Sequence, residues 1–161
     1  MSWLRRLAHL VPHWGTTTPT TPTTTVPEAA APEASVHYAP EIDGDPDPGE
    51  VVWAWVPYED DPSRGKDRPV LILATEGDGW LGLPMTSKDH DRDAADEARW
   101  GRHWMDVGTG GWDAQRRPSE VRLDRVLRLG RDDVRREGAA IDRRIFDQVL
   151  AAVRDLSSRD G

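Results

Sequence analysis

Residues 68–85 read Arg68-Pro-Val-Leu-Ile-Leu-Ala-Thr-Glu-Gly-Asp-Gly-Trp-Leu-Gly-Leu-Pro-Met85, and this stretch decides the fold. Its first half, up to Ala74, is an almost continuous apolar run with the length and composition of a buried strand. The following Gly77-Asp-Gly79 is a signal for a tight hairpin turn. Residues 80–85 then return as a second apolar strand. The stretch therefore predicts a β-hairpin at the centre of the domain.

Short β-branched or aromatic runs, separated by turn residues, predict further elements on both sides of this hairpin. In chain order these are a strand over 50–56, a loop over 58–67, a charged loop over 88–101 with one helical turn at 94–99, a strand over 104–107, a strand within 120–129 and a short helix around 132–137. Five or so short strands of this kind favour a small, strongly bent β-barrel.

The C-terminal helix has the clearest signature. Asp142 is a suitable N-cap, and Ile141 and Phe146 stand at the two positions of a hydrophobic staple. The apolar stripe that follows consists of Ile145, Phe146, Val149, Leu150, Val153 and Leu156. We therefore expect a mainly β domain with a C-terminal helix (α+β), in which the helix covers the barrel.

The N-terminal third differs in composition from the rest. Residues 16–25 contain eight threonines and two prolines, and the small amount of apolar surface from there to Pro48 predicts a disordered linker over 15–48. A glycosylated stalk is the alternative for such Thr/Pro repeats. Residues 1–14 carry apolar side chains at helical spacing, as a short amphipathic segment or a frayed extension would. The folded domain is expected over 49–157, with a tail at 158–161.

The composition excludes several classes of function. The chain has 161 residues and no cysteine, which rules out a disulfide framework, a thiolate zinc site and a cysteine nucleophile. A net charge of −8 argues against a general polyanion binder, although half of it lies in residues 1–48. No apolar run approaches the length of a transmembrane helix. The acidic residues at 89, 91 and 93 imitate a calcium loop, but Ala94 and Trp100 replace its required Gly and Glu, so no metal site is expected.

Five segments at matching spacing resemble one known family. They are Gly49-Glu-Val-Val-Trp53, Asp61-Pro-Ser-Arg-Gly65, Arg68-Pro-Val-Leu-Ile-Leu73, Leu83-Pro-Met-Thr-Ser87 and Ser119-Glu-Val-Arg-Leu-Asp124. Together with the closing helix they resemble the MazF/PemK toxins of type II toxin–antitoxin systems over about residues 49–156. The resemblance implies an SH3-like barrel of the MazF/CcdB type, usually a homodimer, that is held in check by an antitoxin. The N-terminal residues lack a convincing signal peptide, so we expect a cytoplasmic protein.

The resemblance also implies an activity, which is sequence-selective cleavage of single-stranded mRNA without a metal or other cofactor. In that mechanism the ribose 2′-hydroxyl attacks its own phosphate, and the family's catalytic arginine and threonine fall on Arg68 and Thr86. A guanidinium suits a phosphorane, and a neighbouring hydroxyl suits a phosphate held in line for attack. The family often has a glutamate after the loop glycine. Here Asp67 replaces that acid or the base is absent, and Ser87 could assist.

Several other side chains are candidates for contacts to RNA. Loop tryptophans could stack on unpaired bases, or could equally anchor a protein partner, and basic residues could hold phosphates. The candidates are Arg64, Lys66, Lys88, Trp100, Trp112, Arg116 and Arg117. By contrast, the arginines at 122, 125, 128 and 131 have acids between them, which predicts a solvated, ion-paired face. His90 and His103 form an alternative acid–base pair.

A second function remains open at this point. The chain could be a non-cleaving barrel of the same class that binds a protein target, as the CcdB-type gyrase poisons do, or that acts as a regulator. The acidic net charge favours this alternative, whereas the presence of both Arg68 and Thr86 favours the ribonuclease.

Overall fold

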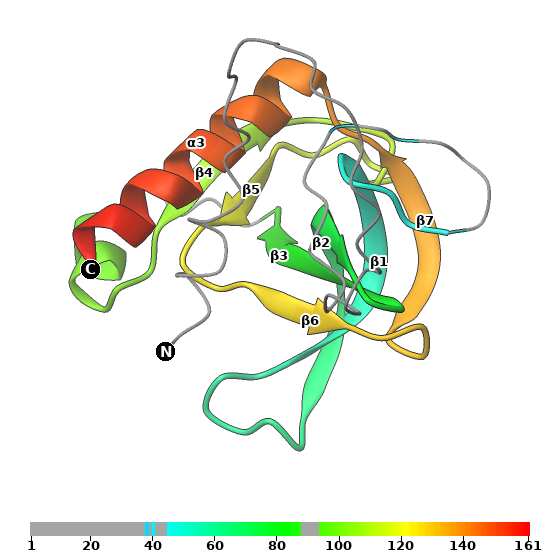
Figure 1. The fold of residues 1–161 in the computed structure, drawn as a ribbon, viewed down its shortest axis with the longest axis horizontal. Coiled ribbons are helices and arrows are strands. Elements are labelled where there is room, and N and C mark those ends of the chain that lie inside the picture. The colour runs from blue at the N-terminus through cyan, green and yellow to red at the C-terminus, as the bar shows by residue number, and fades with distance from the viewer. Residues whose placement is uncertain (1–37, 39, 41–44, 88–93) are drawn as a thin grey trace, which may run out of the picture.

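The computed structural model describes residues 38, 40, 45–87 and 94–161. Its elements are β1 (Glu50–Pro57), β2 (Gly65–Glu76), β3 (Gly79–Thr86), α2 (Ala94–Arg99), β4 (Trp104–Gly108), β5 (Ser119–Arg122), β6 (Leu127–Leu129), β7 (Val134–Ala140) and α3 (Arg143–Arg159). The strands pair in the order β4-β5-β3-β2-β1-β7, and β6 also pairs with β3. Every pairing is antiparallel, and the sheet curls on itself into a half-barrel with α3 across one side (Figure 1). The predicted mainly β barrel with a C-terminal helix is confirmed.

The predicted central hairpin is formed by β2 and β3. Val70 lies opposite Pro84 and Leu71 opposite Leu83, and the two strands meet at the turn around Gly77, whose φ is +63°. Both strands are buried on each face over most of their length, because β1 and β5 flank them and side chains of the core cover them. This explains why the hairpin reads as a continuous apolar run rather than as an alternating one.

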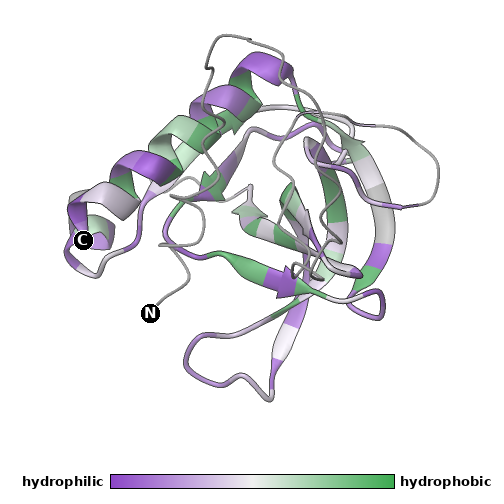
Figure 2. Ribbon diagram, in the orientation of Figure 1, coloured by the Kyte–Doolittle hydropathy of each residue, from purple (hydrophilic) through white to green (hydrophobic). Residues whose placement is uncertain are grey.

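Successive side chains of the strands point to opposite faces, so the sheet has two cores. One core includes Val51, Leu71 and Leu83 and is covered by Phe146 of α3. The other includes Val52, and Leu127 and Leu129 of β6 belong to it. The hydrophobic side of α3 faces the sheet and its hydrophilic side faces solvent (Figure 2).

The start of α3 follows the predicted capping pattern. Asp142 is the N-cap, and its carboxylate accepts a hydrogen bond of 2.8 Å from the backbone N–H of Arg144. Ile141 and Phe146 are both buried in the same core, as the hydrophobic staple requires. The helix continues to Arg159 and so includes the first residues of the predicted tail.

The prediction of a short helix around residues 132–137 is wrong, because β7 occupies this part of the chain. β7 pairs with β1 through Ala140, opposite Glu50, and through Val134, opposite Ala54, with two register shifts between them. The segment is charged and would suit a short helix by itself, but the free edge of β1 offers backbone partners along its whole length. The single strand predicted within 120–129 is likewise two separate strands, β5 and β6.

The linker prediction needs correction at its C-terminal end. The Tyr38 ring packs against Phe146 with the ring centroids 5.6 Å apart, and its hydroxyl donates a 2.7 Å hydrogen bond to the carbonyl of Ile141. Asp45 lies 2.9 Å from the guanidinium of Arg131. These contacts make Tyr38 and Asp45 parts of the folded domain. The amphipathic segment predicted over 1–14 and most of the linker lie outside the described residues.

We expect Gly49→Ala to destabilise the domain more than Gly77→Ala. Both glycines have positive φ, which costs a non-glycine residue about 1 kcal/mol or more. A methyl group at Gly49 would also meet the Tyr38 ring at 2.5 Å, whereas nothing lies within 4 Å at Gly77. Thermal unfolding of the two variants measures the difference. Equal losses would contradict the packing of Tyr38 against the domain.

Candidate active site

Arg68 and Thr86 are brought together by the register of the central hairpin. The paired part of β2 and β3 ends at Val70 and Pro84, so Arg68 and Thr86 each lie two residues beyond the last pair, at the open end of the hairpin. Each residue pairs with the strand that lies outside the hairpin on its own side. Arg68 of β2 pairs with Ala54 of β1, and Thr86 of β3 pairs with Glu120 of β5. Both side chains line a hollow of about 170 Å³ at the open end of the hairpin. The two residues lie on either side of one turn, and this hairpin spacing is the sequence signal for their proximity.

Within the described residues, no ion pair neutralises the guanidinium of Arg68. Its side chain is half-buried, and this loss of solvation lowers the pKa of Arg68, while the nearby phenol of Tyr58 opposes the change. Neither Asp61 nor Asp67 forms an ion pair with it in the described part of the chain. Asp61 instead accepts hydrogen bonds from Ser63, and Asp67 lies 3.4 Å from Arg135. A half-buried cation without an acidic partner is a strong attractor for an anion.

The same hollow collects five more of the side chains singled out from the sequence, which are Lys66, Asp67, Ser87, Trp112 and Arg117. Arg117 is not a free charge, because its Nε donates a 2.8 Å hydrogen bond to Asp113. This bond, together with one from the backbone N–H of Gln115, lowers the pKa of Asp113. Lys66 is exposed and adds positive charge at the rim.

The stacking role expected of Trp112 does not fit its position. Its side chain is only 4% exposed, and its indole N–H donates a 3.1 Å hydrogen bond to the hydroxyl of Ser119. Its carbonyl accepts a 2.9 Å hydrogen bond from the indole of Trp53. A ring buried in this way offers no free face to a base. Trp112 therefore serves as a wall of the hollow and as part of the core.

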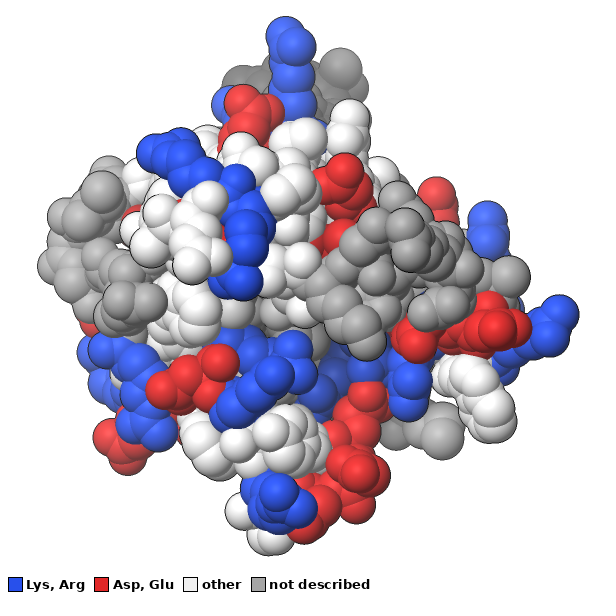
Figure 3. All heavy atoms as spheres, turned by 180° about the vertical axis from the view of Figure 1, so that it is seen from behind, with Lys and Arg blue, Asp and Glu red and all other residues white. Residues whose placement is uncertain are grey.

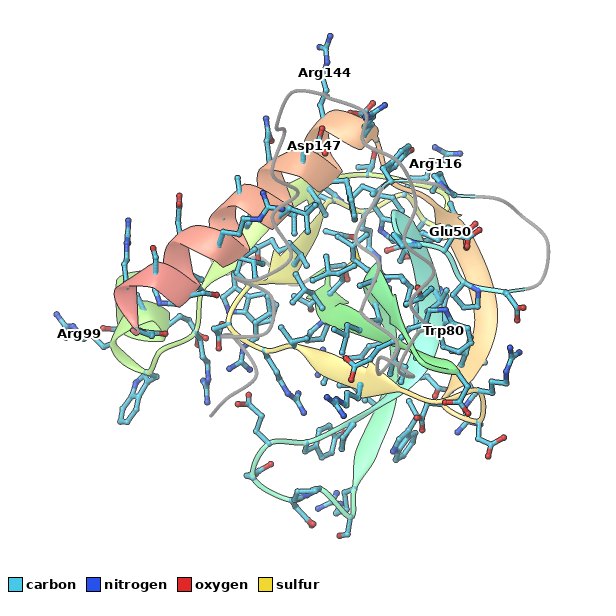
Figure 4. The ribbon with its side chains drawn as sticks, in the orientation of Figure 1. Glu50, Trp80, Arg99, Arg116, Arg144 and Asp147 are labelled. Atoms are coloured by element: carbon cyan, nitrogen blue, oxygen red, sulfur yellow. The ribbon has the colours of Figure 1, made fainter. Side chains whose placement is uncertain are left out.

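Three other candidates lie away from this hollow. Trp100 is 79% exposed at the end of α2, and Arg64 and Arg116 are exposed in loops. Arg116 points outward above the sheet (Figure 4). Lys88 and His90 lie outside the described residues, and His103 contacts Asp124 through its backbone N–H, at 2.7 Å. Seen from behind, the molecule carries a band of Lys and Arg side chains interrupted by acidic ones (Figure 3).

A second and larger hollow, of about 430 Å³, adjoins the first. Arg68 and Met85 line both, so the two hollows share a wall. The larger one is bounded by the segment that follows β1, which includes Tyr58, and by residues of β4 and β5, which include Trp104 and Arg122. Arg68 therefore lies between the two hollows and lines both.

Arg122 and Arg125 were missed by the sequence analysis, which placed them on a solvated face. Arg122 is 7% exposed, bonds to both Glu59 and Asp124, and stacks over Trp104 at 6.0 Å. Arg125 is half-buried and donates a 2.6 Å hydrogen bond to the carbonyl of Pro57. The loop after β1 covers this face of the sheet. The alternation of apolar and charged residues along one strand does not show that a loop distant in the sequence covers its charged face. The prediction of a solvated, ion-paired face does hold for Arg128 and Arg131, which form ion pairs with Glu76 and Asp45.

Burial also changes the electrostatics of these arginines. Loss of solvation lowers the pKa of Arg125, and the positive charges of Arg122 and Arg68 act in the same direction. Both carboxylates that contact Arg122 counteract its desolvation, so the pKa of Arg122 is raised. In the larger hollow, Arg122 is therefore neutralised by two acids, whereas Arg125, like Arg68, forms no ion pair with the described residues.

Acid is expected to destabilise the protein through Glu59. Hydrogen bonding to Arg122 holds the pKa of Glu59 below its ordinary value of 4.5. The carboxylate therefore adds stability above pH 4.5, and this contribution is lost as the pH falls through the lower, folded-state value. Because Glu59 is half exposed, the contribution is of the order found for surface ion pairs, about 0.2–1 kcal/mol.

Thermal unfolding between pH 7 and pH 3 tests this expectation. Glu59→Gln should unfold at a lower temperature than the parent protein at pH 7 and at nearly the same temperature at pH 3. Asp147→Asn is the matched control, because Asp147 points away from α3 into solvent (Figure 4). The same gap between Glu59→Gln and parent at both pH values would contradict the assignment.

The fold and the site define a class of protein, a small antiparallel half-barrel closed by a C-terminal helix, with two hollows that share an arginine. A family model described as "PemK-like, MazF-like toxin of type II toxin-antitoxin system" matches residues 47–157. The chain belongs to this family. It is a toxin of the MazF/PemK type, as the sequence resemblance implied.

Solved structures with a similar fold have low sequence identity to the chain. A MazE–MazF complex from Deinococcus radiodurans has 17% identity and a TM-score of 0.49, covering 70% of this chain and 96% of that chain. An endoribonuclease in complex with its cognate antitoxin from a mycobacterial species has 14% identity and a TM-score of 0.47, covering 68% and 94%. The Mycobacterium tuberculosis toxin MazF-mt6 has 19% identity and a TM-score of 0.44, covering 68% and 96%.

The comparison with curated proteins finds no match. Within the described residues, no helix is long and apolar enough to span a bilayer. The same residues contain no group of three or more His, Cys, Asp or Glu side chains that could hold a metal ion.

Proposed function

We propose that the protein is an endoribonuclease that cleaves single-stranded RNA without a metal, with Arg68 and Thr86 as its catalytic residues. The observation that carries the proposal is the position of these two side chains on neighbouring strands, lining one hollow. The chain belongs to the family of MazF-like toxins that its sequence resembles, and this membership supports the same activity.

The chemistry needs no nucleophile from the protein. The ribose 2′-oxygen attacks the adjacent phosphorus and loses its proton, while the bond from phosphorus to the 5′-oxygen breaks and that oxygen takes up a proton. The products are a 2′,3′-cyclic phosphate and a 5′-hydroxyl. Arg68 stabilises the negative charge that develops on the phosphorane, and Thr86 holds the phosphate in line for attack.

A base for the 2′-hydroxyl comes from the acids and hydroxyls at the rim. Asp67 lines the hollow and is only loosely held, since its ion pair with Arg135 is exposed and 3.4 Å long. Ser87 is exposed beside Thr86 and lines the same hollow. We assign them assisting roles, with Asp67 in place of the glutamate that is frequent in the family.

The test is to incubate purified protein with a long single-stranded RNA in the presence and absence of EDTA. We expect the same fragments in both reactions, with 5′-hydroxyl ends and cyclic phosphates at the 3′ ends. RNA that stays intact at a large excess of protein would overturn the proposal and leave a non-cleaving binding module as the function.

We further propose a cognate antitoxin, a homodimeric state and a cytoplasmic location. The family model that matches the chain describes toxins of type II toxin–antitoxin systems, which supports an antitoxin as its partner. Co-expression with the product of a small adjacent open reading frame, followed by size-exclusion chromatography with light scattering, measures both the complex and the dimer. Separate elution of the two products would contradict the partner.

A further inference from the structure

We propose that the larger hollow is the subsite for a nucleobase next to the cleaved phosphate, and that it selects guanine. The proposal rests on the proposed function, because it takes RNA as the ligand and Arg68 as the phosphate-binding group. Arg68 lines both hollows, so a phosphate held there has the larger hollow directly beside it.

The sizes of the two hollows fit this division. The smaller one, at about 170 Å³, is lined by several charged and hydroxyl side chains around Arg68, which suits a phosphate. The larger one, at about 430 Å³, falls in the range of small-molecule pockets. Its walls include apolar surface from Pro57, Pro84 and Met85 and the half-buried aromatic ring of Tyr58. Unpaired bases in RNA complexes commonly stack on such aromatic side chains.

Most polar side chains of the larger hollow are already engaged by one another. Glu59 bonds to Arg122, and Glu97 accepts a 3.3 Å hydrogen bond from Trp104 and lies 3.6 Å from Arg102. Such groups shape the hollow but have little bonding capacity left for a ligand.

Besides Arg68, which is assigned to the phosphate, two charged side chains of this hollow remain available among the described residues. Asp60 forms no hydrogen bond or ion pair with any described residue. Arg125 has one bond, to the carbonyl of Pro57, and no ion pair within the described residues. Both line the hollow, so it offers one carboxylate and one guanidinium to a ligand.

Guanine matches this pair of groups better than the other bases do. Its N7 and O6 atoms are adjacent acceptors for a guanidinium, and its N1–H and N2–H₂ groups are donors for a carboxylate. Adenine has an amino donor in place of O6, and cytosine and uracil lack a second ring with N7. We therefore assign Arg125 to the acceptor edge of guanine and Asp60 to its donor edge.

Binding of oligonucleotides that cannot be cleaved tests the subsite independently of catalysis. The probes are single-stranded deoxyuridine oligonucleotides with one central deoxyguanosine, deoxyadenosine or deoxycytidine, because the missing 2′-hydroxyl blocks attack. Fluorescence anisotropy should show the guanine probe binding about tenfold more tightly than the other two. Asp60→Asn and Arg125→Met should each abolish most of this preference while leaving the weak binding of the adenine probe nearly unchanged.

Matched controls keep the result interpretable. Asp147→Asn removes an exposed acid from the outer side of α3, away from both hollows, and should retain the full preference. Arg125→Lys keeps the charge but not the two-donor geometry, so it should bind guanine and adenine probes alike. Equal binding of all probes by the parent protein, or an intact preference in Asp60→Asn, would overturn the inference.

The binding result also separates this inference from the proposed function. Guanine-selective binding without cleavage of any RNA would overturn the ribonuclease and retain the subsite. Cleavage of RNA at sites with no enrichment of guanine beside the cut would retain the ribonuclease and overturn the subsite.

Discussion

Replacing Arg68 by alanine is expected to reduce the rate of RNA cleavage by about 100- to 1000-fold, the effect of removing one preorganised group that stabilises a developing anion. Arg68 is half-buried, has no acidic partner among the described residues and lies across the hairpin from Thr86. Its charge is therefore not compensated by an acid of the described residues, and we expect it to act on the phosphorane. Single-turnover cleavage of a labelled RNA at saturating protein measures the loss.

Two comparison variants make this result specific. Arg68→Lys keeps a positive charge but loses the bidentate geometry, and should recover only part of the rate. Arg144→Ala removes an arginine that points into solvent from the outer side of α3, and should leave the rate unchanged (Figure 4). A cleavage rate in Arg68→Ala within a factor of three of the parent protein would remove Arg68 from the mechanism.

Replacing Phe146 by alanine is expected to have the largest effect on stability, about 3–5 kcal/mol. Phe146 is the only phenylalanine in the chain and is fully buried. It joins α3 to the sheet, and the ring of Tyr38 packs against it. Its loss would leave a cavity where three parts of the chain meet. Urea unfolding followed by tryptophan fluorescence measures the change in the free energy of unfolding.

Gln148→Ala serves as the control for this substitution. Gln148 is exposed on the same helix, so its replacement should change the free energy of unfolding by less than about 0.5 kcal/mol. If Phe146→Ala were no less stable than Gln148→Ala, the packing of α3 on the sheet would be contradicted. The active-site hollow would then also lack the support that this core gives to β2 and β3.

Local patterns in the sequence determined the central hairpin, the N-cap at Asp142 and the apolar side of α3. Each depends on residues within a few positions of one another, so short-range rules were sufficient. The proximity of Arg68 and Thr86 depends in addition on the register shift between Ile72 and Ala74, since the pairs next to the turn would by themselves place Arg68 opposite Ser87. The family resemblance supplied the proposed roles of these two residues, and the hairpin register supplies the geometry that fits them.

Only the tertiary structure decided β7, the burial of Trp112 and the positions of Arg122 and Arg125. β7 exists because the edge of β1 provides hydrogen-bond partners for a segment whose own residues would also suit a helix. The two arginines reach the larger hollow because the sheet curls and the loop after β1 covers its face. The contacts of β7, Arg122 and Arg125 with β1 and with the loop after it join residues 63 or more positions apart. Short-range patterns report a residue's neighbours along the chain, whereas closure of the sheet determines which distant side chains share one hollow.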